Sequence, residues 1–332
     1  MIIPVKMKER DYDIVLERGC INNISSLINV DRKVLIITDS LIPITYVNTV
    51  KKDIKDVFVY TVKSGEQSKN FKNFENIIDF MIENNFSRTD CVIALGGGVV
   101  GDMAGFISSV YMRGIDFYNI PTSLLSQVDS SIGGKTAIDK LGIKNVVGAF
   151  YPPKKVIIDP NVLFTLDERQ LHNGLVEAFK MALTCDKSLV NLILESKNLM
   201  DDIDEIIYKA LLIKKSVVEE DPNELGIRKV LNFGHTIGHA IEASYELNEL
   251  LHGECVGLGM LYMASESVRD VIYMFLKKYN LPYEIEIDKD VIYKYICLDK
   301  KRSNNFISIV RVEEIGNYII EKILLEDIKK YF

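Results

Sequence analysis

The run from Cys91 to Asp102 constrains the fold more than any other part of this chain. Five apolar residues, Cys91 to Leu95, have the composition of a buried β-strand, and they lead directly into Gly96-Gly-Gly-Val-Val-Gly101. This is the G-x-G-x-x-G spacing, whose glycines permit a tight strand-to-helix turn and the close approach of a pyrophosphate. A glycine-rich turn that binds nothing has the same sequence, so the motif alone leaves both interpretations open.

The elements around this run favour a nucleotide-binding fold. Short β-branched runs alternate with helical patterns through the first half of the chain, which is the layout of an α/β domain. Apolar residues recur at helical spacing from Phe71 to Ile82 and predict an amphipathic helix that covers the sheet. The predicted strands are Tyr12–Glu17, Lys33–Thr38, Val57–Val62, Cys91–Leu95 and Phe117–Ile120.

An acidic residue follows one of these strands, but at an unusual place in the order. Asp39 ends the Lys33–Thr38 strand, where its carboxylate would accept hydrogen bonds from an adenosine ribose. An ordinary Rossmann fingerprint has its acidic residue about 20 positions after the glycines, whereas Asp39 precedes them. The sequence therefore predicts a Rossmann-like variant of the nucleotide-binding fold.

The second half of the chain reads as mainly helical. It follows the Tyr151-Pro-Pro153 break and the run Lys155–Asp159, near which we place a domain boundary. A length of 332 residues favours two domains, here residues 1–159 and 160–332. A late hairpin is predicted from Phe306–Val310 and Tyr318–Ile320. The helical patterns cover residues 167–184, 188–198, 202–220, 233–246 and 253–278.

Composition excludes several classes of protein. With 48% hydrophobic and 26% charged residues and a net charge of −7, the chain is typical of globular proteins and a poor match for nucleic acid. Charged residues among the first ten argue against a secretory signal, and the apolar stretch Cys91–Gly101 is too short to span a bilayer. We expect a cytoplasmic protein, because its cysteines are odd in number and widely spaced, as reduced thiols are: Cys20, Cys91, Cys185, Cys255 and Cys297.

Three of the four histidines lie close together in the helical half. His235 and His239 are four residues apart, which puts both imidazoles on one helix face, and His252 follows in Leu251-His-Gly-Glu254. Histidines that cap carbonyl groups would give the same pattern, so a metal site is one of two interpretations. A carboxylate on another helix would complete a His₂Glu set with open positions, and Glu177 is one candidate among many.

Cationic residues recur in glycine-rich or apolar surroundings, where a charge is costly unless it has a partner. Together they would hold a phosphate and a carboxylate, although each alone is more commonly a surface or salt-bridged side chain. Gly133-Gly-Lys-Thr136 resembles the end of a Walker A loop without the upstream glycine, so ATP hydrolysis is not expected. The cations are Arg113, Lys135, Lys144, Lys180 and Arg228.

Taken together, these motifs closely resemble those of the 3-dehydroquinate synthase family, in family order and over nearly the whole chain. They are Ser64-Gly-Glu-Gln-Ser-Lys69, Gly96-Gly-Gly-Val-Val-Gly-Asp102, Tyr111-Met-Arg-Gly114, Pro121-Thr-Ser-Leu-Leu-Ser-Gln-Val-Asp-Ser-Ser-Ile-Gly-Gly-Lys-Thr136, Lys144-Asn-Val-Val-Gly-Ala-Phe150, Asn232-Phe-Gly-His-Thr-Ile-Gly-His-Ala-Ile-Glu242, Leu251-His-Gly-Glu254 and Asp299-Lys-Lys301.

The resemblance implies an N-terminal NAD-binding α/β domain and a C-terminal helical domain that holds zinc or cobalt, commonly in a homodimer. The implied reaction is the second step of the shikimate pathway, towards chorismate and the aromatic amino acids. In it, 3-deoxy-D-arabino-heptulosonate 7-phosphate is oxidised by bound NAD, loses phosphate by β-elimination, is reduced again, ring-opens and closes by an aldol step. NAD is thus catalytic and is not consumed.

The resemblance also implies a role for each matching residue. It assigns the metal to Glu177, His235 and His252. Residues implied to act in catalysis are Lys135, Lys180, Lys214, Arg228, Asn232 and His239. Further implied substrate contacts are Arg113, Asp129, Lys144, Asn145, Lys300 and Lys301. The cofactor is assigned to Asp39, Ser64, Gly65, Glu66, Gln67, Ser68, Lys69, Gly98, Val99, Val100, Gly101, Asp102, Thr122 and Ser123, with Lys135 and Lys144 nearby.

Two departures from the family pattern leave the shape of one loop open. Ile143 replaces the usual glycine before the Lys-Asn pair, and Asp139-Lys-Leu-Gly142 differs from the commoner proline-containing loop. His172 belongs to no motif and is interpreted as an exposed residue at a helix start.

Three rival functions share parts of this pattern. Another sugar-phosphate cyclase would keep the NAD loop and the metal triad, and only the substrate pocket would differ. An iron-dependent alcohol or glycerol dehydrogenase would release NADH at every turnover and would need fewer phosphate-binding cations. An inactive, metal-stabilised interaction protein would bind metal and NAD without turnover.

Overall fold

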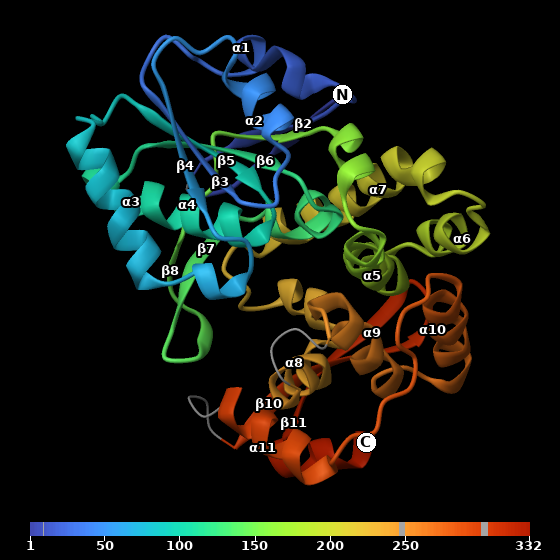
Figure 1. Ribbon diagram of the computed structural model, residues 1–332. Coiled ribbons are helices and arrows are strands. Elements are labelled where there is room, and N and C mark those ends of the chain that lie inside the picture. Colours follow the sequence, from blue (N-terminus) through green and yellow to red (C-terminus); the bar gives the residue numbers. More distant parts are fainter. Residues whose placement is uncertain (9, 246–249, 300–304) are drawn as a thin grey trace. The chain divides into compact units, whose positions relative to one another are not determined.

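The computed structural model describes residues 1–8, 10–245, 250–299 and 305–332, and these form two compact units, Met1–Asp167 and Glu168–Phe332. Figure 1 colours the first unit from blue to green and the second from yellow-green to red. The units divide eight residues after the Asp159 that the sequence indicated. Asp159 itself accepts hydrogen bonds from Gly19 N–H and Asn161 N–H, both at 2.9 Å, which tie the following segment to the first unit.

The first unit is built on a seven-stranded sheet in the order β1-β2-β9-β6-β5-β3-β4, parallel except for the β1–β2 pair. All five predicted strands are present, with ends that differ by a residue at most. The strands are β1 Ile2–Val5, β2 Tyr12–Leu16, β3 Val34–Asp39, β4 Val57–Val62, β5 Cys91–Gly96, β6 Asp116–Pro121 and β9 Lys155–Ile158.

Helices cover both faces of this sheet, because alternate strand residues point in opposite directions. Leu35 and Val92 pack with helices α3 and α4, whereas Val34 and Ile93 pack with α1 and α2. Figure 1 shows α3 and α4 beside the central strands. The predicted helix over Phe71–Ile82 is confirmed. The helices are α1 Ile24–Leu27, α2 Ile44–Lys51, α3 Phe71–Glu83 and α4 Gly98–Val110.

A separate hairpin, β7 Lys135–Lys140 and β8 Ile143–Phe150, was not predicted. Its turn uses left-handed backbone at Leu141 and Gly142, and Asn145 within β8 also has a left-handed φ. Helix α4 packs closely on β7 at Gly105, where a Cβ would lie 2.4 Å from Thr136 Cγ2, so only glycine fits without a shift. The hairpin is therefore fixed against the helix that begins at the glycine-rich loop.

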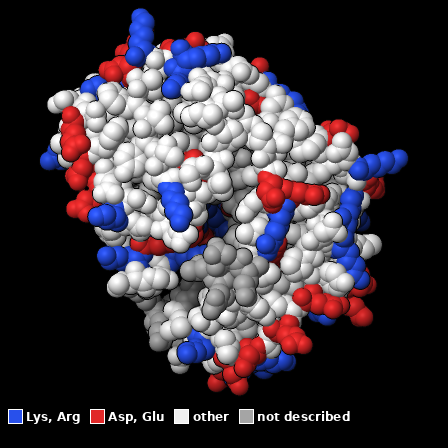
Figure 2. All heavy atoms as spheres, in the orientation of Figure 1, with Lys and Arg blue, Asp and Glu red and all other residues white. Residues whose placement is uncertain are grey.

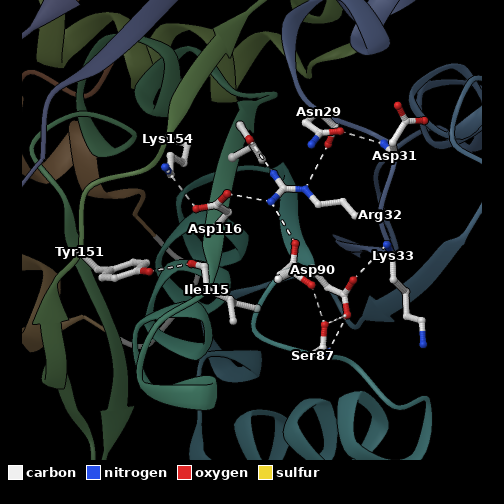
Figure 3. A network of polar contacts seen from close by, with 12 residues as sticks. Asn29, Asp31, Arg32, Lys33, Ser87, Asp90, Ile115, Asp116, Tyr151 and Lys154 are labelled. Carbon is white, nitrogen blue, oxygen red and sulfur yellow. Dashed lines mark hydrogen bonds and ion pairs between the residues drawn. The ribbon is translucent and has the colours of Figure 1, made fainter.

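At the amino ends of the strands, a network of charged side chains joins several loops of the first unit (Figure 3). Arg32 donates from Nη1 to Asp116 Oδ2 at 2.7 Å and from Nη2 to the Tyr118 hydroxyl at 2.8 Å. Asp90 accepts hydrogen bonds from Lys33 N–H and Ser87 N–H. This network stabilises the edge of the sheet opposite the glycine-rich loop.

The second unit consists of seven α-helices, two short 3-10 helices and a β-hairpin in its described residues. The predicted hairpin is confirmed and is longer than expected. The elements are α5 Glu168–Cys185, α6 Lys187–Glu195, α7 Leu199–Glu220, α8 His235–Ser244, α9 His252–Tyr262, α10 Glu266–Lys278, α11 Lys289–Asp299, β10 Phe306–Glu314 and β11 Asn317–Leu324.

One sequence prediction for this unit was wrong, because residues 253–278 form two helices and not one. Val312 of β10 donates its N–H to Met263 O at 3.2 Å and accepts from Ser265 N–H at 3.0 Å. Ser265 Oγ then caps α10 by accepting from Val268 N–H. The strand thus takes the backbone groups that would have continued the helix.

No helix in the described part of the chain is both long and apolar enough to cross a membrane. On the face drawn in Figure 2, Lys and Arg side chains are interspersed with Asp and Glu.

Candidate functional site

Glu177 lies at the centre of a histidine cluster in the second unit. It stands in the middle of α5 with 1% of its surface exposed, and its Oε1 has no hydrogen-bond donor. His252 Nε2 lies 3.5 Å from this oxygen and His235 Nε2 lies 3.8 Å from it. Ligand atoms of His235, His239 and His252 all lie within 4.8 Å of one another. The structure therefore brings together the four residues that the sequence singled out on three helices.

Close packing of α8 on α9 makes this cluster possible. Gly234 precedes α8 with a left-handed φ of 78°, and a Cβ there would lie 2.7 Å from Val256 O. Gly253 follows His252 and donates its N–H to Asn173 Oδ1 of α5 at 2.6 Å. These contacts set the first residues of α8 and α9, His235 and His252, beside α5.

The rings of His235 and His252 are oriented through Nδ1, the nitrogen that points away from Glu177. His235 Nδ1 lies 3.2 Å from Phe233 O, and His252 Nδ1 lies 3.3 Å from Glu242 Oε2. In the neutral imidazole, an Nδ1–H donated to an oxygen leaves Nε2 with a free lone pair, which is the arrangement that metal-binding histidines usually have. Both Nε2 atoms face Glu177 Oε1.

The charges of the cluster are strongly coupled. Burial opposes ionisation of Glu177, but Lys180, His235 and His252 hold its pKa well below the usual range. Burial and the nearby Lys180 ammonium lower the pKa of His235. Burial alone would also lower the pKa of His252, but the nearby carboxylates of Glu177 and Glu242 raise it to about 9.

The cluster fits a divalent metal ion. Its donor set combines a carboxylate oxygen with imidazole nitrogens, and the buried Oε1 of Glu177 needs a positive partner. Lys180 Nζ already binds the other oxygen of Glu177, so Oε1 alone is available. His239 is the most exposed of the three histidines, and geometry within the cluster leaves its role open between ligand and substrate contact.

Sequence reasoning missed Glu242 as part of this cluster. It lies seven residues after His235 on α8, so two helical turns bring both side chains to one face. That spacing was visible in the sequence, but it fits any surface glutamate equally well.

Glu254, in contrast, has a structural role, although it lies only two residues after His252 in the sequence. Its carboxylate accepts both Arg169 Nε at 2.7 Å and Nη2 at 2.8 Å, and it accepts Leu251 N–H at 2.8 Å. It therefore anchors the start of α9.

The buried cations predicted for the second unit are near-completely enclosed. Lys180, Lys214 and Arg228 are 1%, 6% and 2% exposed. Arg228 Nη1 donates to Pro222 O at 2.5 Å, and Asn232 Nδ2 donates to Glu224 Oε1 at 2.6 Å.

A short loop sets these side chains in place. Asp221 ends α7 and accepts the N–H groups of Leu225, Gly226 and Arg228 at 2.9, 2.6 and 3.1 Å. Glu224 in this loop has a left-handed φ of 59°. Neither acidic residue was a sequence candidate, although Asp221 follows the predicted helix in the position of a loop cap.

In the first unit, the predicted cofactor residues gather at the carboxyl ends of β3, β4, β5 and β6, with Ser64–Lys69 following β4. These strands are adjacent and parallel, and the chain reverses its direction of strand addition between β3 and β5, which is where nucleotides bind in such sheets. Asp39 ends β3, the Gly97–Gly98 turn follows β5, and Thr122 N–H bonds to Gly96 O at 3.0 Å.

This edge fits a dinucleotide. Helix α4 begins at Gly98 with no side-chain cap on its first N–H groups, which leaves them for a pyrophosphate. A Cβ on Gly98 would lie 3.1 Å from Ser130 Oγ, so any other residue there would require the Ser130 side chain to move. Ser130 Oγ and Thr38 Oγ1 are buried without a hydrogen-bond partner.

The remaining predicted residues of this unit lie in three separate places. Lys135, Lys144 and Asn145 are exposed on the β7–β8 hairpin, and Asp129 lies in the turn Ser126–Ser130. Arg113 lies past the far end of α4, about 20 Å from the glycine-rich turn at 1.5 Å per residue. Within this unit the structure does not bring Arg113 to the other candidates. Lys300 and Lys301 lie outside the described residues.

Comparisons with known proteins agree with the motifs. Family models for the N-terminal and C-terminal parts of 3-dehydroquinate synthase match residues 59–173 and 174–302. A curated 3-dehydroquinate synthase from Clostridium botulinum (strain Alaska E43 / Type E3) is 41% identical over 345 residues, covering 98% of this chain and 99% of the relative. One from Lactococcus lactis subsp. cremoris (strain MG1363) is 39% identical, covering 100% and 99%.

Solved structures of more distant proteins share the fold. A 2-deoxy-scyllo-inosose synthase complexed with carbaglucose-6-phosphate, NAD⁺ and Co²⁺ has a TM-score of 0.89 at 24% identity, covering 99% of this chain and 100% of that one. A 2-epi-5-epi-valiolone synthase from Streptomyces hygroscopicus subsp. jinggangensis 5008, with NAD⁺ and Zn²⁺ bound, has a TM-score of 0.88 at 24% identity, covering 98% and 97%. An iron-containing alcohol dehydrogenase has a TM-score of 0.65 at 13% identity, covering 96% of each chain.

Proposed function

The chain belongs to the 3-dehydroquinate synthase family of phosphate-eliminating lyases, and we propose that it converts 3-deoxy-D-arabino-heptulosonate 7-phosphate to 3-dehydroquinate and phosphate. The observation that carries the proposal is the buried Glu177 Oε1, which has no hydrogen-bond donor and faces two histidine Nε2 atoms. The structural relatives that bind NAD⁺ with Co²⁺ or Zn²⁺ support NAD and one of these metals as cofactors.

Glu177, His235 and His252 would hold the metal. When bound, the metal supplies Lewis acidity to substrate hydroxyl and carbonyl groups, and NAD takes up and returns one hydride. Lys180 keeps Glu177 ionised and oriented through the oxygen that does not face the histidines. Glu242 and Phe233 O fix the rings of His252 and His235, so each presents Nε2.

The buried cations would bind the acidic groups of the substrate. Lys214 and Arg228 are almost fully enclosed, and an enclosed cation interacts strongly with a phosphate or carboxylate. Asn232, oriented by Glu224, offers an amide to substrate hydroxyls, and His239 is placed at the exposed side of the cluster, where it would contact substrate. The protein thus mainly orients the substrate and stabilises its charge. An oxygen of the substrate's phosphate group can then act as the intramolecular base that removes the proton during elimination.

In the first unit, the uncapped start of α4 would bind the NAD pyrophosphate, and Asp39 would accept hydrogen bonds from its adenosine ribose. Lys135, Lys144 and Asn145 on the hairpin would contact the substrate.

We also propose that the enzyme is a cytoplasmic homodimer. All five cysteines are free thiols, which suits a reducing compartment. Light scattering after gel filtration should give twice the 37.7 kDa of one chain. A mass equal to one chain at micromolar concentration would exclude the dimer.

The activity is tested by incubating the metal-loaded protein with the heptulosonate phosphate and substoichiometric NAD. Phosphate and 3-dehydroquinate should form in equal amounts, as measured by colorimetry and mass spectrometry, and the near-ultraviolet absorbance of NADH should not accumulate. No phosphate release from loaded protein would redirect the search to other sugar phosphates. Accumulation of NADH with an alcohol would instead indicate a dehydrogenase.

A further inference from the structure

One face of helix α5 lies against the first turn of α9. Arg169, Asn173 and Glu177 follow one another at intervals of four residues, so their side chains leave the same side of α5. They meet three consecutive residues at the start of α9. Arg169 contacts Glu254, Asn173 contacts Gly253, and Glu177 contacts His252. The start of α9 is therefore held by the same helix that carries the central carboxylate of the histidine cluster.

The middle contact supplies a cap that α9 does not provide for itself. The residue before the helix is Leu251, whose side chain has no oxygen to accept an N–H group of the first turn. Asn173 Oδ1 takes this place and accepts Gly253 N–H at 2.6 Å. Asn173 is 5% exposed and Gly253 is buried, so without this oxygen the N–H would lose its acceptor in a place that little water reaches.

Backbone packing at the same point fixes the distance between the two helices. A Cβ on Gly253 would lie 2.1 Å from Asn173 O, so α9 approaches α5 more closely than any other residue at position 253 would allow. His252 immediately precedes this glycine, and its Nε2 lies 3.5 Å from Glu177 Oε1. The separation of these two side chains is thus set where Gly253 meets Asn173.

The Arg169–Glu254 ion pair is a second and more accessible hold on the same turn. The Arg169 side chain is 50% exposed, and ion pairs that water reaches contribute little to stability. We therefore expect the buried hydrogen bond of Asn173 to determine the position of α9 more than this ion pair does. The ion pair remains when Asn173 is replaced and should keep the helix folded.

We propose that Asn173 is a positioning residue of the metal site, which caps α9 from α5 and so fixes His252 beside Glu177. Asn173 contacts neither metal nor substrate in this role. The inference rests on the proposed function in one respect, because it takes Glu177 and His252 as metal ligands.

The first test is the affinity of the folded protein for Zn²⁺, measured by competition with a chelator. Asn173→Leu keeps the approximate size of the side chain and removes the acceptor, and the affinity should fall at least about tenfold. Asn173→Ala should show the same loss and is measured as well, because a leucine can disturb the packing of the two helices. Asn173→Asp keeps an oxygen in the same place and should restore most of the affinity.

Asn198→Leu is the matched control. Asn198 caps α7 in the same unit by accepting Met200 N–H at 3.3 Å, and α7 carries none of the proposed metal ligands. The control removes the same chemical group from the start of a helix, and its Zn²⁺ affinity should stay within about threefold of wild type. An equal loss of affinity in this control, or wild-type affinity in folded Asn173→Leu and Asn173→Ala, would overturn the proposal.

Hydrogen exchange of the metal-free proteins tests the position of α9 without metal or turnover. Peptides that contain residues 252–258 should exchange about fivefold faster or more in Asn173→Leu, and at the wild-type rate in Asn198→Leu. Unchanged exchange there would show that Asn173 does not hold the helix, which also contradicts the proposal. If the wild type binds no Zn²⁺, the proposed metal site fails, and exchange still decides whether Asn173 fixes the start of α9.

Discussion

The histidine cluster around Glu177 and the network around Arg32 and Asp116 are both groups of charged side chains, yet they differ in how completely they are paired. Arg32 donates to Asp116, to the Tyr118 hydroxyl and to Asn29 O, and no buried atom of these side chains lacks a partner (Figure 3). Glu177 Oε1 is buried and has no donor. The difference indicates that the Arg32–Asp116 network stabilises the fold, whereas the histidine cluster leaves Glu177 Oε1 available to a ligand.

This comparison gives the largest expected effect to His235→Ala. Removing one metal ligand should leave the purified protein with little metal and lower its activity by at least about 10³-fold. Metal content is measured by mass spectrometry of the element and activity by phosphate release. His172→Ala is the control, because His172 lies outside the cluster. Its side chain is only 13% exposed and packs on Tyr279, so the expectation of an exposed residue was wrong. Full metal occupancy in His235→Ala would remove His235 from the ligand set.

His239→Ala should separate ligand from substrate contact within the same cluster. If His239 contacts substrate and moves a proton there, the variant keeps its metal and loses about 10²- to 10⁴-fold in kcat. Its metal content and rate are compared with those of wild type. Loss of metal would mean that His235 and His239 chelate together, and the third ligand would have to be reassigned.

Glu242→Gln should have a smaller effect, because Glu242 acts through His252. The amide keeps the size of the side chain but binds His252 Nδ1–H more weakly, so metal affinity should fall about 10- to 100-fold. Competition with a chelator measures this affinity, and Glu242→Asp should restore part of it if the carboxylate is what matters. Equal affinity in wild type and Glu242→Gln would show that the 3.3 Å contact does not orient the ring.

Sequence patterns correctly predicted the elements whose structure is determined by the apolar pattern of their own residues. The continuous apolar runs of β3 and β5 and the helical periodicity of α3 were sufficient, since each has a single burial pattern. The break between α9 and α10 was not predictable in this way, because the strand residue Val312, some fifty positions later, takes the backbone groups of Met263 and Ser265. Tertiary contacts override helical periodicity there.

The candidate site shows the same division. His235, His239 and His252 stood out because histidine is rare in this chain and three lie close together. Glu242, Glu224 and Asp221 did not, because a glutamate on a helix or an aspartate after one is common and gains meaning only from what it contacts. The contact between Lys69 Nζ and Asn145 Oδ1 was hidden for a similar reason, since Asn145 lies on the unpredicted β7–β8 hairpin.

The Arg32–Asp116 network gives the smallest expected effect, which concerns stability and its dependence on pH. Burial opposes ionisation of Asp116, but Arg32 and Lys154 outweigh it and lower the pKa of the carboxyl below its ordinary value. A carboxyl with a lower pKa in the folded state stabilises the fold above its unfolded pKa of about 3.9, and this contribution is lost as the pH falls through the folded value.

Asp116→Asn should therefore be less stable than wild type at pH 7, by on the order of 1–2 kcal/mol, and the difference should shrink towards zero as the pH falls below about 3.9. Urea denaturation followed by circular dichroism measures both effects, with Asp53→Asn, an exposed aspartate, as the control. Metal content should stay at the wild-type level, because this network leaves no atom for a ligand. A constant difference in stability across this pH range would mean that the carboxylate charge contributes nothing and that the variant acts through packing alone.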